Sequence, residues 1–118
     1  MADAGLFIGW GAPVRGREAK GLEVFNETLA YYGRLQQDGV IEGFETVLLE
    51  PHGGDLQGFI LVRGSEDRLA QLRVDDEFVR LSTRASMIIE GLGVVGAALG
   101  DGLQQAISTY QEAISDLT

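Results

Sequence analysis

The sequence of 118 residues contains no cysteine, one histidine and two prolines. Without cysteine the chain forms no disulfide and offers no thiolate to a metal ion. Basic residues are also few, with nine Lys and Arg against 18 Asp and Glu, which gives a net charge of −9. Such a charge repels phosphate backbones and anionic membranes, so we expect neither a nucleic-acid partner nor a membrane partner.

Long apolar segments are missing as well. The longest apolar run, residues 87–99, contains Glu90 and falls short of the roughly 20 residues that a membrane-spanning helix needs. Residues 1–4 carry no basic group, and the apolar run after them is too short for the core of a signal peptide. These features predict a cytoplasmic protein.

The residues that are present favour a folded domain. Hydrophobic residues make up 45% of the chain, and its 17 glycines are interspersed among large aliphatic and aromatic residues instead of forming a low-complexity tract. A chain of this length buries roughly two-thirds of the surface that it exposes when unfolded. We therefore expect one globular domain over residues 1–118.

The first half of the chain predicts a strand, a helix and a hairpin. An apolar run bounded by glycines indicates a strand over 5–11. Apolar residues at helical spacing predict a helix over 17–38. Two β-rich runs, 40–50 and 56–63, are separated by the turn-forming segment 51–55, which is typical of a hairpin.

The second half predicts two further helices around one strand. Ser65 is placed to cap a helix that breaks near Val74. A last strand, bent by glycines, is expected over 87–99, and a terminal helix over about 101–117 begins with Asp101 at the spacing of a capping box. The order βαββαβ, followed by this helix, predicts an α+β, ferredoxin-like fold: an antiparallel sheet with its helices on one face.

The hairpin is apolar on both of its faces. Phe44 and Leu48 alternate with Val47 and Leu49, and the partner run 59–62 is apolar at every position. A sheet with one face in water normally alternates apolar and polar residues. We therefore expect the second face to be covered, either by a second subunit or by the terminal helix.

This pattern of elements over residues 5–99 resembles that of the dimeric α/β-barrel proteins, in which two sheets face each other across a two-fold axis. The resemblance implies a homodimer and, as one activity, a cofactor-independent monooxygenase or isomerase that acts on a hydrophobic small molecule. The segments Gly9-Trp-Gly-Ala-Pro-Val-Arg-Gly-Arg-Glu18, Gly39-Val-Ile-Glu-Gly-Phe44 and Glu50-Pro-His-Gly-Gly-Asp55 also look like a bacterial family of small proteins with no assigned function.

Two segments imitate nucleotide-binding motifs but lack the required context. Residues 91–96 match the G-x-G-x-x-G string, yet the 22 residues that follow indicate one helix and not the rest of a βαβ unit. The segment 57–62 has the position of an RNA-recognition motif, but Gln57 stands where a basic residue is needed. We expect no nucleotide cofactor and no RNA ligand.

No catalytic triad, acid pair or metal-ligand spacing stands out, so we expect no cofactor and no metal. We prefer a homodimer that is non-catalytic or binds a small hydrophobic or anionic ligand, with the oxygenase or isomerase as the alternative. Arg17, beside a helix N-terminus, either contacts a small anion or forms local ion pairs. His52, flanked by Glu50 and Asp55, is interpreted as a turn histidine, with an acid-base or metal-binding role as the alternative. The candidate ligand-binding residues are Trp10, Arg17, Phe44, His52 and Phe59.

Overall fold

The computed structural model describes residues 3–117 and contains four strands and four helices among them. In chain order they are β1 (Ala4–Trp10), α1 (Glu18–Gln37), β2 (Gly43–Leu48), β3 (Gly58–Gly64), α2 (Glu66–Arg73), α3 (Asp76–Ser86), β4 (Gly93–Ala98) and α4 (Asp101–Ile114). None of the helices within residues 3–117 has the length and apolar character needed to cross a membrane.

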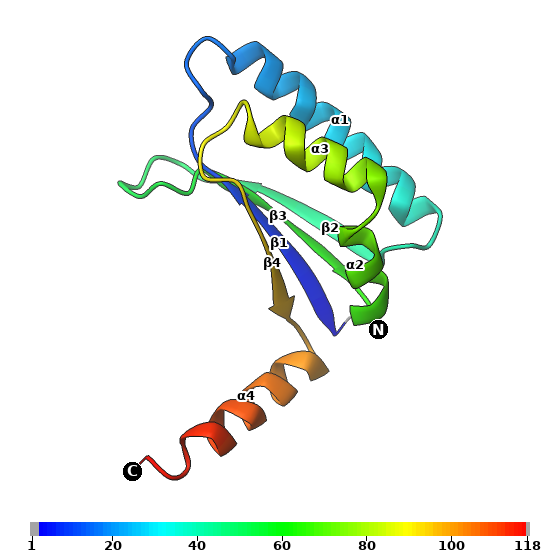
Figure 1. Cartoon of the computed structure of the whole chain (residues 1–118), viewed down its shortest axis with the longest axis vertical. Helices are drawn as coiled ribbons and strands as arrows, with labels where there is room; N and C mark the ends of the chain where they lie inside the picture. The colour runs from blue at the N-terminus through cyan, green and yellow to red at the C-terminus, as the bar shows by residue number, and fades with distance from the viewer. Residues whose placement is uncertain (1–2, 118) are drawn as a thin grey trace.

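The four strands form one antiparallel sheet in the order β2-β3-β1-β4. In its register Phe7 of β1 lies opposite Leu61 of β3 on one side and Val95 of β4 on the other. Helices α1, α2 and α3 all cover the same face of this sheet (Figure 1). The predicted ferredoxin-like α+β fold is confirmed.

The core lies between the sheet and these three helices. Strand β3 alternates strictly: Ile60 and Val62, at 1% and 0% exposure, face the helices, whereas Phe59 and Leu61 on the other face are only half-buried. Tyr32 of α1 packs into the same core. The period of two along β3 therefore separates a dry face from an open one.

Polar contacts join α1 to α3 at the outer edge of this layer. The Tyr31 hydroxyl donates a hydrogen bond to Asp75 Oδ2 at 3.0 Å, directly before α3 begins. Arg34 Nη2 lies 2.6 Å from a carboxylate oxygen of Glu77, two residues further along, in the first turn of α3. These bonds hold the two helices side by side over the sheet.

The predicted helix break is confirmed, since α2 ends at Arg73 with Val74 as its C-cap residue, and the predicted N-cap is present, since the Ser65 hydroxyl accepts a hydrogen bond from the Arg68 amide. The capping box at Asp101 is wrong. Gly100, with φ +53°, is the N-cap residue of α4, and Asp101 lies inside the first turn without capping it. The helix ends at Ile114, short of the predicted end at 117.

The last strand is also shorter than predicted. Residues 87–90 are not part of the sheet: the Glu90 amide donates to the Ala12 carbonyl, and Gly91 turns the chain with φ +65°. Strand β4 begins only at Gly93, because the preceding residues are bonded to the segment that follows β1.

The face of the sheet opposite α1, α2 and α3 is open, and we name it the open face. Its side chains come from alternate positions of all four strands and include Phe7, Val47, Phe59, Leu61 and Val95. Helix α4 does not lie on it but leads away from the end of β4 (Figure 1). The Cα radius of gyration, 16.1 Å, exceeds the about 13.5 Å of a compact domain of this length, as such a projecting helix requires. Within one chain the second apolar face is therefore uncovered.

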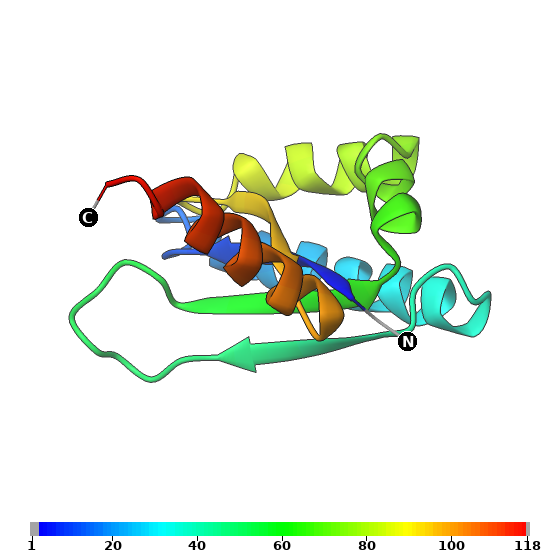
Figure 2. The same cartoon turned by 90° about the horizontal axis from the view of Figure 1, so that it is seen from below.

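The loop between β2 and β3 extends past the end of the sheet (Figure 2). His52 closes it: one imidazole nitrogen, Nε2, lies 2.7 Å from the Leu56 carbonyl, and the other, Nδ1, accepts a hydrogen bond from the Gly54 amide. Both ring nitrogens are thus used within the loop, and an acceptor Nδ1 places the proton on Nε2.

Two buried tyrosines predict a loss of stability in base. Burial raises the pKa of both Tyr31 and Tyr32 above the ordinary value of 10.0, and the bond to Asp75 adds to the effect at Tyr31. The folded state therefore prefers the neutral phenols. Their contribution to the free energy of unfolding is fully present below about pH 10. Above that pH the free energy of unfolding falls, by up to about 1.4 kcal/mol per pH unit for each tyrosine. Denaturant titrations between pH 8 and pH 11 should show a shallower fall in Tyr32→Phe. Equal slopes for the two proteins would contradict this account.

Candidate functional site

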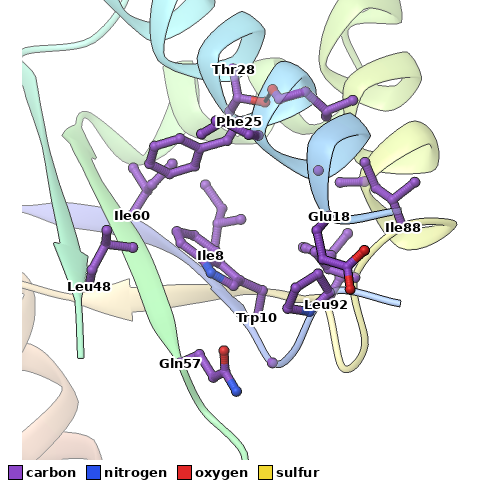
Figure 3. Close-up of a pocket in the computed structure, with 17 residues that line it drawn as sticks. Ile8, Trp10, Glu18, Phe25, Thr28, Leu48, Gln57, Ile60, Ile88 and Leu92 are labelled. Carbon is purple, nitrogen blue, oxygen red and sulfur yellow. Dashed lines mark hydrogen bonds between the residues drawn. The ribbon is translucent and has the colours of Figure 1, made fainter. Parts of the chain in front are cut away.

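A cavity of about 280 Å³ lies between the inner face of the sheet and helix α1. Its walls are the end of β1, the first three turns of α1 and the segment that joins α3 to β4 (Figure 3). The lining side chains are mostly aliphatic or aromatic. They include Trp10, Leu22, Phe25, Leu48 and Ile88.

Trp10 and Phe25 form an aromatic wall of the cavity. Their ring centroids are 5.9 Å apart at an interplanar angle of 70°, an edge-to-face contact, and both rings border the open space (Figure 3). The indole lies directly over Gly58, its partner on β3: a Cβ added there would stand 2.8 Å from the indole ring and 2.9 Å from the Val47 carbonyl oxygen. The absence of a side chain at Gly58 is what allows the indole to lie this close to β3.

Backbone hydrogen bonds between the segment after β1 and the segment after α3 hold the wall of the cavity on the α3 side. The Gly11 amide donates to the Glu90 carbonyl at 2.7 Å, and the Val14 amide donates to the Ile88 carbonyl at 2.8 Å. These bonds bring residues 88–90 beside the segment that follows β1. As a result, Ile88 and Ile89 face the cavity and the chain does not extend β4.

The mouth of the cavity is unusually apolar. Leu22 on α1 is 61% exposed and Leu48 at the edge of β2 is 68% exposed, yet both line the cavity. Gly21 on α1 lies beside them, and a Cβ added there would meet no atom within 4 Å. A hydrophobic molecule in the cavity would remove these leucines from water, at about 25 cal/mol for each Å² of apolar surface.

Two polar side chains of the lining, those of Glu18 and Thr28, are already hydrogen-bonded to the backbone of their own chain. The Glu18 carboxylate accepts a hydrogen bond from the Gly16 amide at 2.9 Å, and the Thr28 hydroxyl donates to the Val24 carbonyl. Glu18 is the sole charged side chain among the described residues that line the cavity. The cavity is therefore suited to an uncharged, largely apolar ligand.

The five residues singled out from the sequence are not brought together. Trp10 lines the cavity. Phe44 lies further along the inner face, where its ring packs against Tyr32 at 5.7 Å, and Phe59 stacks on Phe7 on the open face at 5.1 Å. Arg17 lies beside the lining residue Glu18, with its guanidinium in solvent and donating to the Met87 carbonyl.

His52 stands apart from the cavity in the β2–β3 loop and is bonded as described above. Arg17 places its charge at the C-terminal end of α3, where a cation interacts favourably with the helix dipole. Across residues 3–117, no three His, Asp or Glu side chains come together as a metal site would require. The ligand-binding roles of these residues stay predictions.

The sequence did carry a signal for the residues that were missed. The apolar arc of α1 is wider than a helix on one sheet requires, and Leu22 and Phe25 in that arc line the cavity. Gly21 in the middle of a helical pattern was a second signal, because a glycine there lowers the stability of the helix and is therefore compatible with a need for space at that position.

No protein-family model and no curated protein sequence matches this chain. Solved structures with the same fold do exist. A hydroxynitrile lyase from Passiflora edulis superposes with a TM-score of 0.63 at 11% sequence identity, over 86% of this chain and 97% of its own. A dimeric protein of unknown function and ferredoxin-like fold from Bacteroides fragilis gives a TM-score of 0.59 at 15% identity, over 81% and 96%.

A third structure is that of SnoaB, a cofactor-independent oxygenase from Streptomyces nogalater. Its TM-score is 0.54 at 18% identity, and the match covers 84% of this chain and 95% of SnoaB. At identities this low the three comparisons establish the fold that the chain shares with these proteins, and they fit its resemblance to dimeric ferredoxin-like proteins.

The position of the indole predicts the effect of Gly58→Ala. The added methyl group displaces the Trp10 ring, because the second atom that it meets is a backbone oxygen that cannot move aside. Overpacking of this kind costs about 1–3 kcal/mol of unfolding free energy. We expect this loss together with a red shift in the emission of Trp10, the single tryptophan of the chain. The control is Gly43→Ala, where the methyl group meets no atom within 4 Å; equal behaviour of the two variants would contradict the prediction.

Proposed function

We propose that this protein binds an uncharged hydrophobic small molecule in the cavity beside Trp10 and acts as a homodimer. The observation that carries the first part is the apolar cavity whose mouth exposes Leu22 and Leu48. Exposed leucines that converge on a cavity are costly in water, and a bound apolar molecule relieves that cost.

The charges near the cavity support a neutral ligand over an anionic one. Glu18 is the charged group among the described lining residues, and it repels a second negative charge. The guanidinium of Arg17, which sequence reasoning offered to an anion, donates to the Met87 carbonyl. The proposal therefore keeps the hydrophobic ligand and drops the anionic one.

The open face supports the homodimer. In a chain with 18 acidic residues, the positions of β1–β4 on this face carry one acid, Glu45, and it lies 3.3 Å from the one base among them, Arg63. The rest is aromatic, aliphatic or glycine, with Phe7 and Phe59 stacked at its centre. A nearly neutral apolar face fits a second copy of itself, and the similar protein from Bacteroides fragilis is itself dimeric.

The alternative, a cofactor-independent oxygenase or isomerase, draws on the likeness to SnoaB. In that case the same cavity holds the substrate, and the ligand is changed while it is bound. Incubating the protein with any ligand that binds, in air, separates the two when oxygen uptake is followed and products are resolved by liquid chromatography with mass spectrometry, since an isomer differs from the ligand in retention time and not in mass. Turnover favours the oxygenase or isomerase, and unchanged ligand favours the binding protein.

The ligand proposal predicts a preference between 2-naphthol and 2-naphthoate, which share one ring system but differ in charge at neutral pH. We expect 2-naphthol to bind at least tenfold more tightly and to raise the melting temperature, because the carboxylate faces an apolar lining and Glu18. Calorimetric titration gives both affinities. Equal affinities, or binding of the anion alone, would overturn the proposal.

A matched pair of variants locates the bound molecule. Gly21→Leu places a side chain at the mouth of the cavity, whereas Gly33→Leu makes the same change on α1 away from it, and neither Cβ meets an atom within 4 Å. Both replacements raise the helix propensity of α1 by up to about 1 kcal/mol. Only Gly21→Leu should weaken 2-naphthol binding, by tenfold or more. Equal binding by the two variants would place the ligand elsewhere.

A charge introduced on the open face tests the homodimer, because it would have to be buried if this face is the interface. Leu61→Lys puts a cation at its centre, next to Phe7, and we expect it to weaken self-association at least tenfold in sedimentation velocity. Gln71→Lys adds the same charge to the exposed side of α2 and should leave association unchanged. If Leu61→Lys associates like Gln71→Lys, the open face is not the interface.

A further inference from the structure

Helix α4 has an apolar stripe that none of the described residues, 3–117, buries. Four residues at helical spacing form the stripe, and we name them the α4 stripe: Leu103, Ile107, Tyr110 and Ile114. None of the residues of α4 is buried, and Tyr110 is 65% exposed. At about 100° per residue, the acids Asp101 and Glu112 fall on the opposite side of the helix. The helix is thus built to bury one side and keep its charges in water.

A free helix of this size is not expected to be stable. Helices shorter than about 12–15 residues are marginal in water, because packing against an apolar partner supplies most of their stability. Helix α4 has 14 residues, and its main contact within the chain is with β4, at one end. The helix therefore needs an apolar surface from outside its own chain.

The first turn of α4 is held by contacts with the segment before β1, and these contacts define the direction in which the helix leaves the sheet. The Leu99 amide donates to the Asp3 carbonyl, and a Cβ added at Gly102 would collide with that same carbonyl oxygen. Gly100 turns the chain with φ +53° directly before the helix. These contacts direct α4 away from the sheet on the side of the open face (Figure 1).

A second copy of this chain fits the α4 stripe better than a membrane does. Amphipathic helices that lie on membranes are rich in Lys and Arg, whereas residues 101–118 hold three acids and no base. The sheet alone presents a small footprint to a partner: four strands of six or seven residues span on the order of 400 Å² in projection. A helix about 21 Å long that projects on the side of the open face enlarges the surface that a second copy can cover.

We propose that α4 is an exchanged arm, whose stripe packs against the second copy of the chain in the homodimer. The inference rests on the proposed homodimer and adds to it how the two subunits hold each other. By two-fold symmetry each subunit gives one arm and receives one, so the contact is made twice. Each arm becomes a stable helix only as the dimer forms.

A photo-crosslinker tests the exchange in the full chain. Benzoyl-phenylalanine replaces Tyr110 on the stripe in one variant and Gln105, on the opposite side of the helix, in the control. Irradiation should give covalent dimers from position 110 and at least fivefold fewer from position 105. Crosslinks only within one chain, from a protein that sediments as a dimer, would overturn the exchange and leave the homodimer standing. A protein that sediments as a monomer would overturn both.

A second pair of variants measures what the arm contributes. Ile107→Glu and Gln105→Glu each add one negative charge to α4, on the stripe and opposite to it. We expect Ile107→Glu to raise the dimer dissociation constant at least tenfold and to remove hydrogen-exchange protection from residues 103–114, while the core amides stay protected. Gln105→Glu should match the unaltered protein. Unchanged dissociation and protection in Ile107→Glu would contradict the proposal, whatever the crosslinks show.

Discussion

A four-stranded sheet that is apolar on both faces has to be covered on both, and this requirement organises the molecule. The chain covers one face with its own helices α1, α2 and α3, so that Leu6, Ile60 and Val62 are almost fully removed from water. The other face, with Phe7 and Phe59 stacked at its centre, is left open. Helix α4, which carries the exposed stripe and contributes to the radius of gyration of 16.1 Å, projects on the side of that open face (Figure 1).

The covered face explains where the cavity comes from. Helices α1 and α3 are fastened to each other near the end of α1 by Tyr31 and Arg34, and the sheet beneath them is closely packed there. At the other end, the chain after α3 is held by its backbone to the segment after β1, and glycine replaces a side chain at positions 21 and 58. Space for a ligand is thus left at one end of an otherwise continuous core.

Much of the fold follows from local patterns in the sequence. Periods of 2 and 3.6 located the strands and helices, and the serine at 65 and the break at Val74 were found because capping is a property of a few adjacent residues. The apolar hairpin indicated the open face correctly, since side-chain alternation depends only on the strand itself. The errors arose where a distant segment decides the conformation. Residues 87–90 continue an apolar run, but bonds to Ala12 and Val14 remove them from β4.

The candidate site was harder to predict for the same reason. Trp10 was among the candidate residues, but most other residues of the cavity come from α1 and from the segment between α3 and β4 and meet it only in three dimensions. Phe44 and Phe59 were also candidates, and both belong to the hairpin; their opposite parity puts them on opposite faces of the sheet.

Sedimentation equilibrium of the unaltered protein at micromolar concentration tests most directly whether a second copy covers the open face. The account predicts twice the mass of the chain, and the mass of a single chain at every concentration would contradict it.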